Sequence, residues 1–128
     1  MFTSLPQEIE FAAPPEKVYA TLTDAAQFQA MTGAPAEIDA RAGGALSLFG
    51  GMITGHILEL VPNQRMVQSW RAGNWPAGIF SIARFDFTPS GAGTKLVFDH
   101  SGIGEDMKPH LEGGWHKMYW EPLAKSLA

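Results

Sequence analysis

The residue best placed for acid–base chemistry is His100. Its segment alternates apolar and polar residues, so His100 shares one face with Leu96 and Phe98, while Val97 and Asp99 point to the other. A histidine on an interior strand face can donate a proton to a bound ligand or accept one from it. No acidic residue shares that face locally, so the plainer interpretation is a neutral histidine bonded to backbone or water. We therefore name no catalytic residue and keep His100 as the one candidate.

The remaining histidines and glycines do not complete a known reactive or metal-binding pattern. His110 and His116 lie on different sides of a predicted helix, and the chain has no cysteine, so no metal site is predicted. The segment Gly102-Ile103-Gly104 lacks the third glycine of a dinucleotide loop. We interpret it as a tight turn with positive φ before a helix. No Gly-x-Ser-x-Gly sequence marks a hydrolase nucleophile, and we expect neither a metal nor another cofactor.

Aromatic side chains on the inward-facing strands and on the C-terminal segment favour binding of an apolar molecule over a reaction. Such side chains form either a cavity lining or an ordinary core. In a curved sheet we expect the inner ones to pack and the outer ones to touch a ligand. Trp75 lies in a predicted loop, where it would guard the cavity mouth or stand exposed. The predicted ligand-cavity residues are Gln68, Trp70, Phe85, Phe87, Phe98, His100, Trp115, Met118 and Tyr119.

These side chains must be positioned by the C-terminal segment, which is predicted to form one long helix over residues 104–128. Apolar residues recur along it at helical spacing, and the stretch from Trp115 to Tyr119 supplies the predicted buried side, Met118 included. The pair Gly113-Gly114 costs about 1 kcal/mol per residue relative to alanine, and it would let another backbone come close. Pro122 removes one helical hydrogen bond. Because of these costs, we expect the helix to be held by packing on a sheet.

Before this helix, short apolar runs alternate with turn signals, the pattern of consecutive strands. Two short helices follow the first strand, beginning at Pro15 and at Thr23 or Asp24. Strands with no helix between them must pair antiparallel, and only the terminal helix is long enough to cover one face. The predicted fold class is therefore α+β, a curved antiparallel sheet around a long C-terminal helix. The predicted strands are 7–12, 45–49, 53–61, 66–71, 80–88 and 94–101, with a weaker one at 37–41.

Composition limits the classes of function. The chain has 128 residues, of which 45% are hydrophobic and 17% charged, and we expect one domain over residues 1–128. A net charge of −4 gives no attraction for nucleic acid or anionic lipid. No apolar run is long enough to span a membrane, and no basic region followed by an apolar core marks a leader. We expect a soluble, cytoplasmic protein, and a homodimer is left open.

Motifs along nearly the whole chain resemble one known family. They are Val18-Tyr19-Ala20, Leu22-Thr23-Asp24, Gly43-Gly44, Gly55 with Glu59, Trp70-Arg71, Thr94 with Leu96, His100-Ser101-Gly102 and Gly114-Trp115. The pattern is similar to that of the activator of heat-shock-protein-90 ATPase homologue-like family, within the START-like, birch-pollen-allergen-like (SRPBCC) superfamily. The resemblance implies a helix-grip fold and a hydrophobic ligand between sheet and helix. Tyr19 and Met31 stand where the family often has tryptophan.

We therefore predict binding of a small hydrophobic molecule in a cavity between the sheet and the C-terminal helix. The resemblance to START-like proteins leaves an enzyme open, of the cyclase, dehydratase or hydrolase type acting on an aromatic or polyketide-like compound. That alternative needs converging polar groups, and only His100, Gln68 and Tyr119 are available. The family name adds a third alternative, a chaperone-associated protein-interaction domain. We rank it last because no additional domain accompanies this one.

Overall fold

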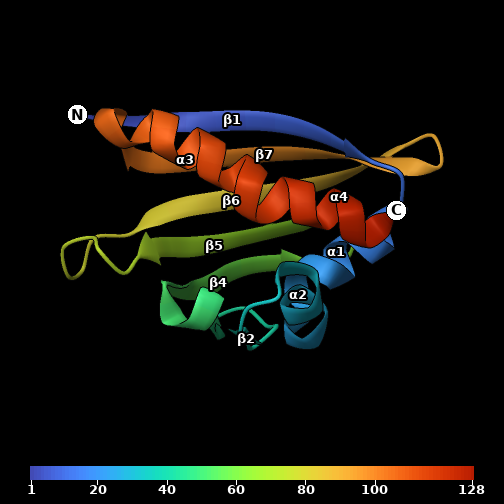
Figure 1. Ribbon diagram of the computed structural model, residues 1–128, viewed down its shortest axis with the longest axis horizontal. Helices are drawn as coiled ribbons and strands as arrows, with labels where there is room; N and C mark the ends of the chain where they lie inside the picture. The colour runs from blue at the N-terminus through green and yellow to red at the C-terminus, as the bar shows by residue number, and fades with distance from the viewer.

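The computed structural model describes residues 1–128, and its centre is a curved sheet of seven antiparallel strands (Figure 1). The strands lie in the order β1-β7-β6-β5-β4-β3-β2, so the first strand pairs with the last. Their bounds are β1 Phe2–Phe11, β2 Glu37–Ile38, β3 Ala45–Leu48, β4 Ile53–Val61, β5 Arg65–Ala72, β6 Ser81–Ser90 and β7 Gly93–Gly104. Every predicted strand is present. β1 begins before the predicted residue 7 because an edge strand tolerates Pro6.

Two short helices follow β1, as predicted: α1 spans Pro15–Thr23 and α2 spans Ala25–Thr32. Asp24 caps α2, because its carboxylate accepts the backbone N–H of Gln27 at 3.0 Å. Gly33 ends the helix with φ +76°, a conformation that glycine adopts without strain. Both helices pack near the C-terminal end of the chain (Figure 1).

The C-terminal segment is helical over residues 105–127, but it is not one regular α-helix. Its parts are the 3-10 turn η2 (Glu105–Met107), α3 (Lys108–Trp115), the π-helical turn η3 (His116–Trp120) and α4 (Glu121–Leu127). Pro122 carries no N–H, and the residue before it, Glu121, donates its N–H to the His116 carbonyl, five residues back. Because the π turn holds an extra residue, Tyr119 and Trp120 both face inward and are buried.

Two details of the prediction were wrong in this region. Met118 was expected on the buried side, but it is 44% exposed, because the π turn moves the inward face to Tyr119 and Trp120. Gly102 has the predicted positive φ, +72°, yet it lies within β7 rather than in a turn before the helix. It forms a bulge opposite β1, where the pairing shifts by one residue.

The terminal helix packs directly on the concave face of the sheet, as predicted. Phe98 of β7 and Trp115 of α3 are 1% and 2% exposed, and their ring centroids are 4.3 Å apart. Trp120 lies 5.1 Å from Phe98, and Tyr19 of α1 lies 5.5 Å from Phe87 of β6. Aromatic contacts therefore fill most of the middle of the concave face.

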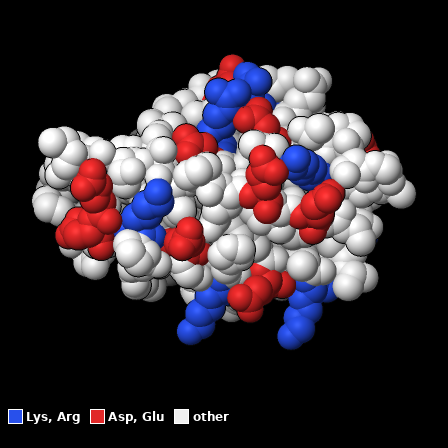
Figure 2. All heavy atoms as spheres, turned by 90° about the horizontal axis from the view of Figure 1, so that it is seen from above, with Lys and Arg blue, Asp and Glu red and all other residues white.

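The outer face of the sheet is exposed and carries ion pairs beside the exposed apolar residues Ile82 and Val97. Asp86 accepts hydrogen bonds from Arg65 and Arg84 at 2.8 and 2.7 Å, and Lys95 lies 3.1 Å from Glu8. Figure 2 shows the molecule from above, over the β1 edge of the sheet, and acidic and basic side chains are interspersed on that side. Exposed ion pairs of this kind contribute about 0–1 kcal/mol each. No helix in the structure has the length and apolar character needed to cross a membrane.

Candidate ligand-binding pocket

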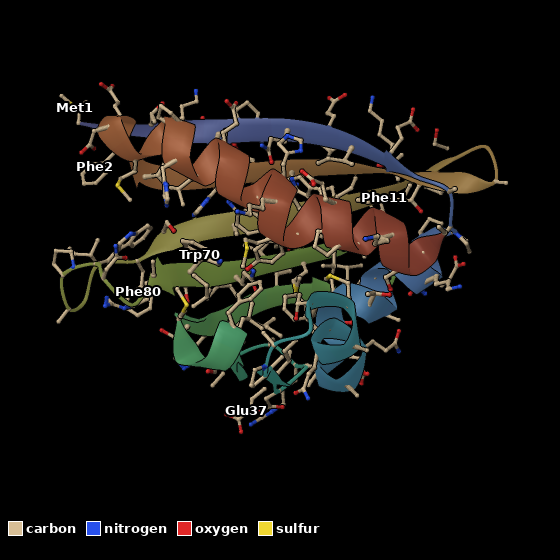
Figure 3. The ribbon with its side chains drawn as sticks, viewed as in Figure 1. Met1, Phe2, Phe11, Glu37, Trp70 and Phe80 are labelled. Atoms are coloured by element: carbon tan, nitrogen blue, oxygen red, sulfur yellow. The ribbon has the colours of Figure 1, made fainter.

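A pocket of about 470 Å³ lies under the first half of the terminal helix. Its walls come from α3 and η3, from the ends of β4 and β5, and from the loop of residues 73–80 that joins β5 to β6. The 3-10 turn η1 (Phe49–Gly51) completes the wall beside β4. Figure 3 shows Trp70 of β5 between the sheet and this helix. The aromatic residues of the wall are Phe49, Trp70, Trp75, Trp115 and Tyr119.

Two of these residues, Trp70 and Trp115, have ring orientations fixed by hydrogen bonds. The Trp115 Nε1–H donates to Nδ1 of His100 at 3.0 Å, and the Trp70 Nε1–H donates to the Tyr119 hydroxyl oxygen at 3.4 Å. The two indole rings lie 5.6 Å apart, with 35° between their planes. Because the protein engages both N–H groups, these rings offer a ligand their π faces and carbon edges.

His100 lies behind Trp115, fully buried, and is held as a neutral ring. Because Nδ1 accepts from Trp115, the proton of the neutral imidazole is assigned to Nε2, which donates to Oγ of Ser81 at 2.7 Å. Ser81 donates in turn to the Trp70 carbonyl at 2.8 Å. Burial lowers the pKa of His100 to about 4. Both ring nitrogens are therefore engaged within the protein.

The loop of residues 73–80 forms the mouth of the pocket, and Trp75 is the half-buried residue that turns inward from it. The Trp75 ring meets Trp70 edge to face, with centroids 5.5 Å apart. Arg71 holds the loop, because its guanidinium donates to the carbonyl oxygens of Trp75 and Pro76, both at 2.9 Å. The same guanidinium lies 5.8 Å from the ring centre of Phe80. Of the two alternatives predicted for Trp75, a place at the cavity mouth or full exposure, the structure has the first.

The rest of the wall is apolar or neutral. No lysine, arginine, aspartate or glutamate lines the pocket, and besides Tyr119 its polar side chains are Asn74 and His110, both at exposed positions. Met52 and Met118 are rim residues, 69% and 44% exposed. Methionine is flexible and polarisable, so such a rim adapts to ligands of different shape. No three side chains of the metal-ligating types are grouped closely enough to hold a metal ion.

The structure brings four of the nine expected cavity residues together in this pocket: Trp70, Trp115, Met118 and Tyr119. Gln68 and Phe85 line a separate internal cavity of about 10 Å³, room for at most one water. Phe87, Phe98 and His100 lie in the core, outside both cavities. The reason is packing: the helix rests on the centre of the sheet, so side chains there meet protein instead of open space.

Several wall residues were not in the predicted set. Leu111 and Met107 belong to the apolar stripe of the helix and could have been included on that basis. Phe49 and Met52 come from a short turn with no periodic pattern, so no signal in the sequence identifies them. The expected role of Gly113-Gly114 was wrong, because a Cβ on either glycine would meet no atom within 4 Å. Gly114 instead lines the pocket, where the missing side chain leaves space.

A curved antiparallel sheet that grips a C-terminal helix, with an apolar pocket between them, defines the class of helix-grip proteins. Within this class, residues 12–128 match the family model described as "Activator of Hsp90 ATPase homolog 1-like protein", and the chain belongs to that family. The family membership expected from the sequence motifs is therefore confirmed.

The match to a curated human relative covers only part of that protein. The human "Activator of 90 kDa heat shock protein ATPase homolog 1" is 30% identical over 116 residues, which are 91% of this chain and 34% of the human protein. The present chain thus spans about a third of that relative.

Two solved structures share the fold over almost all of the chain. PFC0360w, an HSP90 activator from Plasmodium falciparum, has a TM-score of 0.84 and 26% identity, over 92% of this chain and 91% of that one. CalU16 from Micromonospora echinospora has a TM-score of 0.85 and 24% identity, over 99% of this chain and 77% of that one. At that identity, CalU16 supports the fold alone.

Proposed function

We propose that this chain binds a small, uncharged, apolar molecule in the pocket under α3. The observation that carries the proposal is a pocket of about 470 Å³ whose wall includes five aromatic side chains and no lysine, arginine, aspartate or glutamate. Pockets of roughly 300–1,000 Å³ with mainly apolar walls suit drug-sized molecules. Apolar surface that a ligand buries there contributes roughly 25 cal/mol per Å².

We propose binding rather than a reaction, because the polar groups expected for catalysis do not converge on this pocket. Gln68 lines the separate small cavity, and His100 has both ring nitrogens engaged by Ser81 and Trp115. Of the three expected groups, Tyr119 alone lies in the pocket wall. A cyclase, dehydratase or hydrolase would need a second group within reach of the same ligand atom.

Two neighbouring glycines offer a matched test of this proposal. Gly114 lines the pocket and Gly113 does not. A Cβ at either position meets no atom within 4 Å, and neither residue has a positive φ, so a side chain can start from either position without strain. Leucine favours a helix over glycine by roughly 0.5–1 kcal/mol. Gly114→Leu and Gly113→Leu should therefore both fold, while only the first fills the pocket.

The measurement is a titration with a neutral naphthalene fluorophore, followed by energy transfer from the tryptophans. We expect one probe per chain for the wild type and for Gly113→Leu. Binding to Gly114→Leu should be about 5- to 150-fold weaker, since overfilling a packed space costs about 1–3 kcal/mol. Equal affinities of the two variants, or a wild type that binds no probe, would contradict the proposal.

A second candidate function is contact with a chaperone ATPase, and the names of two similar proteins support it. The human relative is named an activator of the 90 kDa heat shock protein ATPase, and the P. falciparum protein is named an HSP90 activator. This chain covers 91% of the P. falciparum chain. The argument from a missing additional domain, which ranked this role last, therefore carries less weight.

The test of the second candidate is the ATP hydrolysis rate of a 90 kDa heat-shock chaperone from the same organism, with and without this protein. Faster hydrolysis that is the same for the wild type and Gly114→Leu would support a surface contact independent of the pocket. An unchanged rate over a wide range of protein concentrations would rule this role out.

A further inference from the structure

Tyr119 is a buried residue of the pocket wall, and its hydroxyl group donates no hydrogen bond to another protein group. Tyr119 is 4% exposed and lines both this pocket and the small neighbouring cavity that Gln68 also lines. Its oxygen accepts the Trp70 Nε1–H at 3.4 Å, and this is the one hydrogen bond that the hydroxyl makes. A hydroxyl group can donate one hydrogen bond while it accepts others, and buried polar groups in proteins rarely leave that capacity empty.

The surrounding rings hold this hydroxyl in place. The Tyr119 ring lies 4.1 Å from Trp115, 5.5 Å from Phe49 and 5.8 Å from Phe28, measured between centroids. With neighbours on several sides, the ring cannot turn its hydroxyl out to solvent. Burial also raises the pKa of Tyr119 far above its usual value, so the group keeps its proton at every ordinary pH. Because its oxygen already accepts a hydrogen bond, its O–H is a stronger donor.

No other buried donor is available to a ligand in this pocket. The indole N–H groups of Trp70 and Trp115 are engaged by Tyr119 and His100. Asn74 and His110 lie at exposed positions. The wall also carries no carboxylate or ammonium group to pair with a charged ligand, and an unpaired charge is costly to bury.

We propose that the pocket selects neutral, ring-containing molecules that carry a carbonyl-type oxygen at the buried end, and that Tyr119 is the specificity-determining residue that donates to this oxygen. This inference rests on the proposed binding function and adds the chemical class of the ligand. Flat rings pack well against the aromatic side chains of the wall. The Tyr119 hydroxyl is the one buried donor, so the ligand needs one acceptor oxygen at its buried end.

The test compares two probes with the same three-ring frame. Fluorene has a CH₂ group at the position where 9-fluorenone has a carbonyl group. Their affinities are measured by displacement of the naphthalene fluorophore from the wild type and from Tyr119→Phe. Tyr119→Phe also frees the Trp70 Nε1–H, so the comparison is repeated in a Trp70→Phe background, where Tyr119 is the one donor that distinguishes the two probes. We expect Tyr119→Phe to weaken fluorenone by about 2- to 10-fold more than fluorene, the range of one hydrogen bond.

Two controls make the outcome specific. The carbonyl stretching band of bound fluorenone should lie at lower frequency in the wild type than in Tyr119→Phe. Gln68→Met changes the polar residue of the neighbouring small cavity, and it should leave the fluorenone-to-fluorene ratio unchanged.

Equal weakening of both probes by Tyr119→Phe, with an unshifted carbonyl band, would overturn this inference and leave the binding function standing. A preference for fluorenone that is lost in Gln68→Met would overturn it as well, because the acceptor would then depend on the small cavity. If neither probe binds the wild type, the proposed function itself fails and this inference fails with it.

Discussion

At the scale of single residues, His100 and Trp115 join the sheet to the helix through one buried hydrogen bond of 3.0 Å. The alternation in β7 places His100 on the interior face, and that much follows from the sequence. Its partners do not, because the indole N–H comes from α3 and the serine hydroxyl from β6. Only the packed structure shows that both ring nitrogens are engaged within the core.

This hydrogen-bonded histidine predicts a pH dependence of stability. The pKa of His100 is about 4 in the folded protein against an ordinary value of 6.5, so the unfolded chain takes up a proton first as the pH falls. The contribution of His100 is complete above about pH 6.5 and decreases down to about pH 4. At about 1.4 kcal/mol per unit, the loss amounts to about 3 kcal/mol. Urea unfolding followed across this pH range measures it.

The control for this prediction is His100→Gln, whose amide can still donate to Ser81 but does not titrate. Carboxylates also contribute to acid unfolding, so the quantity to compare is the difference in unfolding free energy between the two proteins. That difference should shrink as the pH falls from 6.5 to 4. A difference that stays constant over this range would show that His100 is not held neutral by the fold.

At the scale of elements, the strands and the helix followed from different signals in the sequence. A short apolar run between turn signals predicted β4 at residues 53–61, and the structure has Ile53–Val61. The terminal helix was predicted from a regular helical period, which the π turn at His116–Trp120 interrupts. The period therefore misassigned Met118 and did not include Trp120 in the buried face. A π turn is a response to Pro122 and to packing, and it leaves no periodic pattern of its own.

The pocket was harder to predict than the elements because non-periodic segments build a third of it. Phe85 and Phe98 follow the same alternating pattern as Trp70, yet Trp115 and Trp120 cover both of them. Trp70 lies towards the end of its strand, where the wall is continued by η1 and the loop of residues 73–80. A pattern along one strand does not reveal where a helix ends its contact with the sheet.

The loop at the mouth gives the prediction that belongs to this scale. Arg71 holds two carbonyl oxygens of the loop, so Arg71→Met should free the segment of residues 73–80. We expect faster hydrogen exchange at the amides of Trp75 and Ile79, which bond to Ala72 and Pro76. The cost of opening should fall by about 1–3 kcal/mol, the worth of hydrogen bonds to a charged group. Exchange measured by mass spectrometry on loop peptides detects this change.

The matched control is Arg84→Met, which removes an arginine bonded only to Asp86 on the outer face of the sheet. This variant should leave exchange in the loop as it is in the wild type. An equal effect of the two variants, or none from Arg71→Met, would mean that the loop is held by Trp75 packing alone.

At the scale of the whole molecule, the free apolar space lies at one end of the terminal helix. At the other end, α1 and α2 pack on α4, as Figure 1 shows. A groove there is lined by Lys117, Glu121 and Lys125, and its charged walls do not suit an apolar ligand. Met31 lines that groove and Tyr19 packs on Phe87, so the two departures from the family pattern lie outside the apolar pocket.

The four tryptophans of the chain allow the central claim to be tested at one site at a time. Trp70, Trp75 and Trp115 line the pocket, while Trp120 does not and donates its indole N–H to Gln7 at 2.7 Å. In a nitrogen-15 correlation spectrum, each indole gives one resolved N–H signal. Titration with the neutral naphthalene probe should shift the signals of Trp70, Trp75 and Trp115 together, with one dissociation constant, and shift that of Trp120 least. Signals that stay in place at saturating probe, or a shift that is largest at Trp120, would contradict a ligand site under α3.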